Sequence, residues 1–538
     1  MQLPIHPATR ASGSSPSGGL LHDPAGFSEI FLGAFRRDLL SFYPGCRLDL
    51  EPMLTLAGLS VASPRASTTL AFQLDEDDGS ALESARVSLY GNWYRLSFRG
   101  GLTLGPRDRD LIRAIGRVME LHHQILFQRS RVSLLQLRRG MPEDHYIAAC
   151  VDPSAYSAAA TSPSRIAEAI LTLRTMALST YENRRVTTGA IIVGPGTGPG
   201  PVRLCTTRQR STQALDFGVE LTSLKTVHRL CDGRRTLFLV DRQGKLADVV
   251  DIRHWAICQS RAAPDHEPSL SVPCPRVYEF HALATRSGGH VCLVLSPNQE
   301  IKVFAAGVQA FVFAHGRWRV LDPESKYARW ESAVGSPRLA RVLFQTALDL
   351  AEERQGGLLV VVADPSQAIG RLIAPHDLLE PETSSAGRDD ETDDESTSRP
   401  LSLFGLTSMS ESSADETGSR PLAMSPLPPL VEPLAKRSIH YLARGGPVTE
   451  LDAAVLESLA GLDGALVTDS AGRLLAFGAI LRHDALSLAS ADRASPPAVV
   501  EGARTTAALV ASRFGPVLKI SEDGIVSCFL GGARIWDL

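Results

Sequence analysis

Apolar residues recur at helical spacing in three long segments of the chain. Residues 107–129 carry them three or four positions apart, which predicts an amphipathic helix with one apolar face formed by Leu111, Ile115, Val118, Leu121 and Ile125. Two further helices are predicted to start at Ser162-Pro163 and Ser336-Pro337, because a capping serine followed by proline favours a helix start. An apolar run follows each of these two helices, at 189–193 and 357–362. Short apolar runs bounded by glycine are typical of buried strands.

Four other segments have the pattern of a strand, a turn and a second strand. They are 85–99 around Gly91-Asn92, 236–252, 290–305 and 464–480. Two alternating runs joined by a few turn-forming residues indicate a β-hairpin. Buried strands and hairpins that alternate with amphipathic helices predict an α/β fold with a mixed β-sheet flanked by helices.

Composition sets two low-complexity segments apart from the folded regions. The first, residues 1–24, is rich in Ser, Gly and Pro. The second, residues 380–429, combines acidic runs with Ser, Thr and Pro. Neither can bury enough apolar surface to offset its ordering entropy, so both are expected to be disordered. The predicted divisions are a disordered start (1–24), an α+β domain (25–270) and a second domain (276–538) that holds a β-meander (276–322), a core (336–379 and 430–538) and an acidic insertion (380–429).

Net charge and cysteine content bear on the binding partners and the cellular compartment to be expected. The chain has 55 Lys and Arg against 59 Asp and Glu, a net charge of −4, which gives no electrostatic reason to expect nucleic-acid or anionic-membrane binding. Its eight cysteines show no CxxC spacing and suit a reducing compartment. No apolar run approaches the roughly 18 residues that span a bilayer, and the first residues lack a signal-peptide pattern. We therefore expect a cytoplasmic protein with no membrane partner.

Two motifs earlier in the chain have both a functional and a structural interpretation. The run Gly194-Pro-Gly-Thr-Gly-Pro-Gly200 follows a predicted strand, as a phosphate loop does, but it lacks the Lys-Ser/Thr pair and its prolines remove amide donors. A flexible loop is the favoured interpretation. Glu120 and His123 lie one helical turn apart, beside His122. Without a distant third ligand, an ordinary amphipathic helix is favoured over a metal site.

Three motifs near the C-terminal end carry the residues of a candidate site. The first, Asp463-Gly464-Ala465, places an acid and a glycine at the start of a strand. The second, Gly502-Ala-Arg-Thr-Thr-Ala-Ala508, opens a helix with an arginine and two threonines, and helix starts favour anions. The third, Ser521-Glu522-Asp523-Gly524, is an acidic turn after a strand. Each motif also has a structural interpretation, respectively a turn, a helix cap and a hairpin corner.

The order and spacing of these motifs resemble the diadenylate cyclase domain of DNA-integrity-scanning proteins and of membrane-anchored bacterial cyclases. That family carries D-G-A, then G-x-R-H-R-A-A, then S-E-E-x-G. The resemblance extends back to the predicted helix at 337–354 and the strand at 357–362, so the acidic insertion interrupts the domain. More faintly, 25–270 resembles the sensor-type regions fused to such cyclases.

The resemblance implies condensation of two ATP into cyclic di-AMP, with a divalent cation, Mg²⁺ or Mn²⁺, and a homodimer or higher oligomer for activity. It implies catalytic roles for Asp463, Arg504 and Glu522, with Asp463 and Glu522 also as metal ligands. The implied nucleotide-binding residues are Gly464, Ala465, Gly502, Thr505, Thr506 and Ser521.

The chain departs from the family pattern at two places. Leu462 stands where the family usually has His, and Thr505 and Thr506 replace the His and second Arg of R-H-R. Loss of an arginine removes a charge-assisted phosphate contact that threonine cannot replace. Two hypotheses therefore stay open: an active cyclase, or a degenerate module that binds a nucleotide without turnover. A scaffold with an unrelated core is the third, and it leaves the ordered motifs unexplained.

Overall fold

The computed structural model describes residues 24–51, 70–75, 84–98, 104–127, 139–157, 163–196, 215–224, 227–261, 270–379, 447–482 and 502–538. These residues form helices and mixed sheets, which confirms the predicted α/β class. The two segments expected to be disordered lie outside the described residues, apart from Pro24. None of the helices in these ranges has both the length and the hydropathy to cross a membrane.

The N-terminal unit (24–157) packs helices against a small antiparallel sheet of strand order β1-β4-β3-β2. The predicted hairpin at 85–99 is confirmed, but its turn residues are Tyr90 and Gly91, both at positive φ, so Asn92 already pairs with Leu89. The elements of this unit are α1 (Pro24–Phe42), β1 (Arg47–Leu50), β2 (Gln73–Leu74), β3 (Ser84–Leu89), β4 (Asn92–Ser97), α2 (Pro106–Phe127), α3 (Pro142–Val151) and a 3-10 turn (Pro153–Tyr156).

The central unit (163–320) is built on a seven-stranded sheet of order β13-β12-β11-β10-β7-β8-β9, in which only β7 and β8 pair in parallel. Ser164 caps α4 by accepting a hydrogen bond from the Ala167 amide, so the helix begins at Arg165. Its main elements are α4 (Arg165–Ala177), β5 (Thr180–Tyr181), β6 (Arg184–Arg185), β7 (Thr188–Ile192), α6 (Val227–Leu230), β8 (Thr236–Val240), β9 (Leu246–Asp251), α7 (Ile252–Arg261), α8 (Glu279–Thr285), β10 (Val291–Leu295), β11 (Ile301–Ala305), β12 (Val308–Ala314) and β13 (Arg317–Val320).

The meander β10–β13 belongs to this central sheet. Strand β10 pairs antiparallel with β7, with Val291 opposite Ile192, so the meander extends the sheet of the preceding region. We expected it to belong with the 276–538 domain; the boundary drawn at 270–276 falls inside the central unit instead. The reason is burial. Alternate residues of β10 face two different apolar clusters, so both faces of this strand are covered, which is typical of a strand in the interior of a sheet with helices on both sides.

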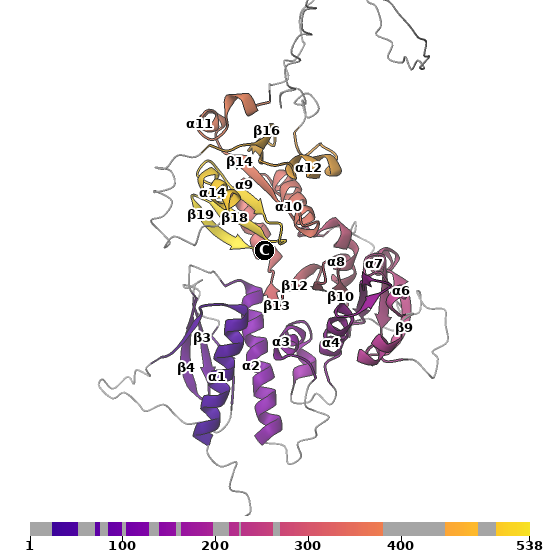
Figure 1. Cartoon of the computed structure of the whole chain (residues 1–538). Coiled ribbons are helices and arrows are strands. Elements are labelled where there is room, and N and C mark those ends of the chain that lie inside the picture. Colours follow the sequence, from indigo (N-terminus) through magenta and orange to yellow (C-terminus); the bar gives the residue numbers. More distant parts are fainter. Residues whose placement is uncertain are drawn as a thin grey trace, which may run out of the picture.

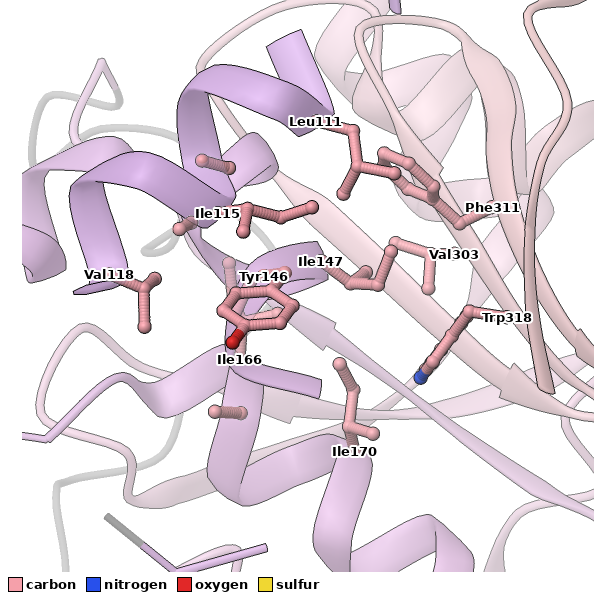
Figure 2. Close-up of a cluster of buried hydrophobic side chains, with 14 of the residues drawn as sticks. Leu111, Ile115, Val118, Tyr146, Ile147, Ile166, Ile170, Val303, Phe311 and Trp318 are labelled. Carbon is pink, nitrogen blue, oxygen red and sulfur yellow. The ribbon is translucent and has the colours of Figure 1, made fainter. Parts of the chain in front are cut away.

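Helices of the N-terminal and central units share one hydrophobic core against this sheet. Figure 2 shows side chains of α2 and α3 gathered with Ile166 and Ile170 of α4 around Val303, Phe311 and Trp318 of the meander. On the opposite face, Trp255 of α7 and Tyr278, in the 3-10 turn before α8, pack against the sheet. The periodic positions predicted for the 107–129 helix are the ones buried here.

The C-terminal unit (323–538) has a six-stranded sheet of order β16-β15-β14-β17-β18-β19, with helices on both faces. Helices α9, α10 and α12 cover one face, and α14 covers the other (Figure 1). The elements are α9 (Pro323–Val334), α10 (Pro337–Glu352), β14 (Gly357–Val362), α11 (Pro365–Ala368), α12 (Ala453–Ala460), β15 (Ala465–Asp469), β16 (Leu474–Ala479), α14 (Ala503–Ala511), β17 (Val517–Ile520), β18 (Val526–Leu530) and β19 (Ala533–Asp537); short 3-10 turns at Val219–Ser223, Arg276–Tyr278 and Pro375–Asp377 complete the described chain.

Candidate functional site

The Asp463-Gly464 motif lies in the loop that leads into β15. Gly464 has φ +113°, and a Cβ there would lie 2.4 Å from the carbonyl carbon of Gly478 in β16. Only glycine meets both conditions, the positive φ and the contact with the next strand. The backbone conformation therefore explains why position 464 is glycine, independently of the nucleotide contact expected from the sequence. Asp463 is exposed beside it.

Arg504 lies in the first turn of α14, whose N-cap residue, Gly502, makes no side-chain capping bond. The guanidinium crosses Gly356, where a Cβ would lie 2.1 Å from Nη1. The same Nη1 donates a hydrogen bond to Oε1 of Glu522 at 3.0 Å. The side chains of Arg504 and Glu522 are 40% and 72% exposed, so this ion pair contributes at most about 1 kcal/mol and is readily exchanged for another anion.

Strand pairing brings the three motifs to one end of the C-terminal sheet. Strand β14 runs parallel to β15, with Leu359 opposite Leu466, and antiparallel to β17, with Gly357 opposite Ile520. The starts of β14 and β15 therefore meet the end of β17. Continued past the strand ends, this register sets Asp463 level with Gly356, and Glu522 follows directly from the end of β17. The motifs are far apart in sequence, and the tertiary structure makes them neighbours.

The acidic motif forms a tight turn between β17 and β18. The Ser521 amide donates to the Ile525 carbonyl and the Gly524 amide donates to the Ser521 carbonyl, both at 2.9 Å, which leaves Glu522 exposed at the tip. Gly524 has φ +79°, and a Cβ there would lie 2.7 Å from Nη1 of Arg354. Arg354 in turn is paired with Glu300. Arg354 could not be predicted from the sequence as part of this turn, because nothing in its local pattern distinguishes it from a residue after a helix end.

Thr505 and Thr506 differ in position. Thr505 is 4% exposed and faces the sheet, whereas Thr506 is half-buried. The spacing of Thr505 to Ala508, one helical turn apart on the buried face, is the sequence signal that points to this burial. The amides of Thr505 and Thr506 both donate to the Gly502 carbonyl, so the amides at this helix end without an internal acceptor are those of Ala503 and Arg504.

The carboxylates of the site suit a hard cation only in part. Among the described residues, no group of three or more His, Cys, Asp and Glu side chains is arranged to hold a metal ion. Mg²⁺ is commonly held by one or two carboxylates together with substrate phosphates. Asp463 is exposed, and no ion pair joins it to another described residue, so it fits that role. Glu522 fits it only if Arg504 moves away.

The two earlier motifs have structural roles in the described residues. His123 is buried, its ring packs edge-on against Phe31 and Tyr90 at centroid distances of 5.3 and 5.7 Å, and burial lowers its pKa. In the glycine-rich run, the Gly194 amide donates to Nδ1 of His290 and the Gly196 amide donates to a backbone carbonyl. Both findings favour the amphipathic helix and the ordinary loop; residues 197–200 lie outside the described part.

No family model, curated protein or solved structure matches this chain.

Proposed function

We propose that residues 336–379 and 430–538 form a diadenylate cyclase-type nucleotidyltransferase domain that condenses two ATP into cyclic di-AMP and two pyrophosphates. One observation carries the proposal: Arg504 and Glu522 are in contact over Gly356, at the end of the sheet where the strand after Asp463 begins. A mixed sheet with helices on both faces is also the architecture that the resemblance implies. On this proposal, the N-terminal and central units regulate the domain as a sensor.

The reaction requires each 3′-hydroxyl to attack the α-phosphate of the other nucleotide. Each attack forms an O–P bond, breaks the bond to the β-phosphate oxygen and releases pyrophosphate; the hydroxyl proton passes to solvent or to a carboxylate. Asp463 orients the attacking hydroxyl or holds a divalent cation, Mg²⁺ or Mn²⁺. When bound, the cation neutralises charge on the phosphates. Arg504 exchanges Glu522 for a phosphate, aided by the exposed amides of the α14 N-terminus. Because the reaction is symmetric, two copies meet face to face in a two-fold homodimer.

The second candidate function is nucleotide binding without turnover. The burial of Thr505 and the pairing of Arg504 with Glu522 favour it, since both reduce the number of groups facing a triphosphate. With one arginine in place of two, the phosphate loses a charge-assisted contact. The domain then serves as a nucleotide-sensing module rather than a catalyst.

The deciding experiment incubates the purified full chain with ATP and Mn²⁺ or Mg²⁺ and measures cyclic di-AMP by mass spectrometry. The cyclase predicts product in the wild type and none in Asp463→Asn, which keeps the size of the side chain but removes its charge. ATP affinity falls less than turnover in this variant, because Arg504 still holds phosphate. Absence of product with retained ATP binding supports the sensing module. Absence of both product and ATP binding rejects the two candidates together.

A gain-of-function variant separates the two candidates further. Thr506→Arg restores a phosphate-binding arginine at a half-buried position, whereas His at the buried Thr505 overpacks the helix–sheet interface. If the wild type is a weak cyclase, Thr506→Arg raises product formation. If the domain only senses, the variant binds ATP more tightly and still makes no product.

A further inference from the structure

A cavity of about 550 Å³ lies where the N-terminal, central and C-terminal units meet. Its described walls come from the end of α1, the segment before α2, strand β13, the start of α9 and strand β19. The C-terminus of the chain lies at this junction (Figure 1). The volume is within the roughly 300–1,000 Å³ that small-molecule sites occupy. The cavity is separate from the candidate site at Asp463, Arg504 and Glu522, none of which lines it.

Positive charge predominates in the walls. Five basic side chains line the cavity against three acidic ones: Arg317, Arg319, Lys326, Arg329 and Arg534 against Asp108, Asp322 and Asp537. Burial lowers the pKa of Lys326 to about 8 and also lowers the pKa of Arg319, which means that the surrounding acids do not offset the cost of burying these two cations.

Two of the three acidic groups, Asp108 and Asp537, have hydrogen-bond or ion-pair partners. Asp108 accepts hydrogen bonds from the Tyr43 hydroxyl at 2.8 Å and from the Gly105 amide at 2.9 Å, and burial raises its pKa. The Asp322 carboxylate packs on Gly105, where a Cβ would lie 1.8 Å from Oδ2. With Asp108 hydrogen-bonded and the third acid, Asp537, paired with Arg534 at 3.5 Å, the walls still carry more basic than acidic side chains toward an anion that enters the cavity.

Five aromatic side chains form another part of the walls. They are Phe42, Tyr43, Phe98, Trp318 and Trp536. Trp318 and Trp536 come from β13 and β19, strands of two different sheets, so rings approach the cavity from both. Flat apolar walls next to fixed cations select a ligand that has a ring at one end and a negative charge at the other.

We propose that this cavity binds a small anion that carries a flat ring, namely an aromatic carboxylate or a ring-bearing phosphate up to the size of a nucleoside monophosphate. Arg319 and Lys326 hold the anionic group, Lys326 with the N–H groups that do not donate to the Leu321 carbonyl, and the aromatic side chains stack on the ring. The binding claim stands independently of the proposed function. A regulatory role rests on it: Ile525 lines the cavity and directly follows Gly524 of the acidic turn, so an occupied cavity contacts the segment that carries Glu522.

The test measures binding to the full chain by calorimetry and by fluorescence of Trp318 and Trp536. The probes are AMP (ring and phosphate), 4-hydroxybenzoate (ring and carboxylate), adenosine (ring alone) and ribose 5-phosphate (phosphate alone). The proposal expects AMP or 4-hydroxybenzoate to bind, which identifies the phosphate or the carboxylate class, and adenosine and ribose 5-phosphate to bind at least about tenfold more weakly.

Two variants and two controls decide where the probe binds. Lys326→Met and Arg319→Met each keep an apolar stem and remove one charge, so each weakens binding about tenfold or more. Arg371→Met removes a charge from an exposed site far from the cavity lining and leaves binding unchanged. Arg504→Met leaves the binding of 4-hydroxybenzoate unchanged, and with AMP it leaves the part of the binding that Lys326→Met and Arg319→Met remove, which distinguishes this cavity from the candidate active site. The proposal is overturned if neither ring-bearing anion binds, if both cavity variants bind like wild type, or if only Arg504→Met loses the probe.

Discussion

Two histidines buried in the central unit make its stability depend on pH. His281 in α8 is 0% exposed and His290 before β10 is 1% exposed. Nε2 of His281 donates to the Gly233 carbonyl at 3.0 Å, and Nδ1 of His290 accepts from the Gly194 amide at 3.2 Å. Protonation of His290 turns that acceptor into a donor that faces another donor. Both rings are therefore held in the neutral form.

The size and sign of the effect follow from the two pKa values. Burial lowers the pKa of His281 to about 4 and that of His290 to about 4, from about 6.5 in an unfolded chain. Between these pH values the unfolded chain binds protons that the folded chain does not. The contribution of the two neutral histidines to the free energy of unfolding is therefore fully present above about pH 6.5 and is lost as the pH falls toward 4. From pH 7 to pH 5, each histidine lowers the free energy of unfolding by about 2 kcal/mol, or about 4 kcal/mol together.

Urea unfolding at pH 7 and pH 5, followed by circular dichroism, measures this loss. In the double variant His281→Gln and His290→Asn, amide groups take over the two hydrogen bonds without a titratable ring, so most of the pH-dependent loss disappears. His315→Asn changes an exposed histidine in the turn after β12 and serves as the matched control, with the wild-type pH dependence retained. The reasoning is refuted if the double variant loses as much stability as the wild type between the two pH values.

Three further predictions concern the C-terminal unit and its contact with the central sheet. Gly464→Ala lowers the free energy of unfolding by about 2–5 kcal/mol, because the new Cβ meets Gly478 at a positive φ; Gly531→Ala, at a positive φ with open space around it, costs only about 1 kcal/mol in the same urea titration. Lys302→Met leaves the buried Glu352 without its cation and Glu300 with Arg354 alone, and it costs about 3–5 kcal/mol, measured by thermal and urea unfolding; an unchanged midpoint contradicts the buried network. Replacement of 380–429 by a short flexible linker keeps the melting temperature and ATP affinity of the wild type, and a large fall in either shows that this segment packs into the domain.

Local sequence patterns determined the position of several elements. The period of the apolar residues and the Ser-Pro start located α10, which runs from Pro337 to Glu352, and the apolar run after it is β14. These features depend on side chains within a few residues of each other, and neighbours in sequence are enough to specify them. The three C-terminal motifs and their order could also be identified from the sequence alone, because each motif is a short contiguous segment.

The tertiary structure alone decided which of these elements meet. The apolar run of β10 predicts a strand but does not identify its partner strand. Only long-range packing pairs β10 with β7 and so makes the meander part of the central sheet. The rotation of α14 about its axis, fixed by packing on the sheet, buries Thr505 and directs Arg504 over Gly356 to Glu522. The cavity between the units likewise has walls from segments hundreds of residues apart, such as Tyr43 and Trp536, which no local pattern connects. Contacts of this kind form only when the whole chain packs, because the free energy that selects them is the burial of surfaces contributed by distant segments.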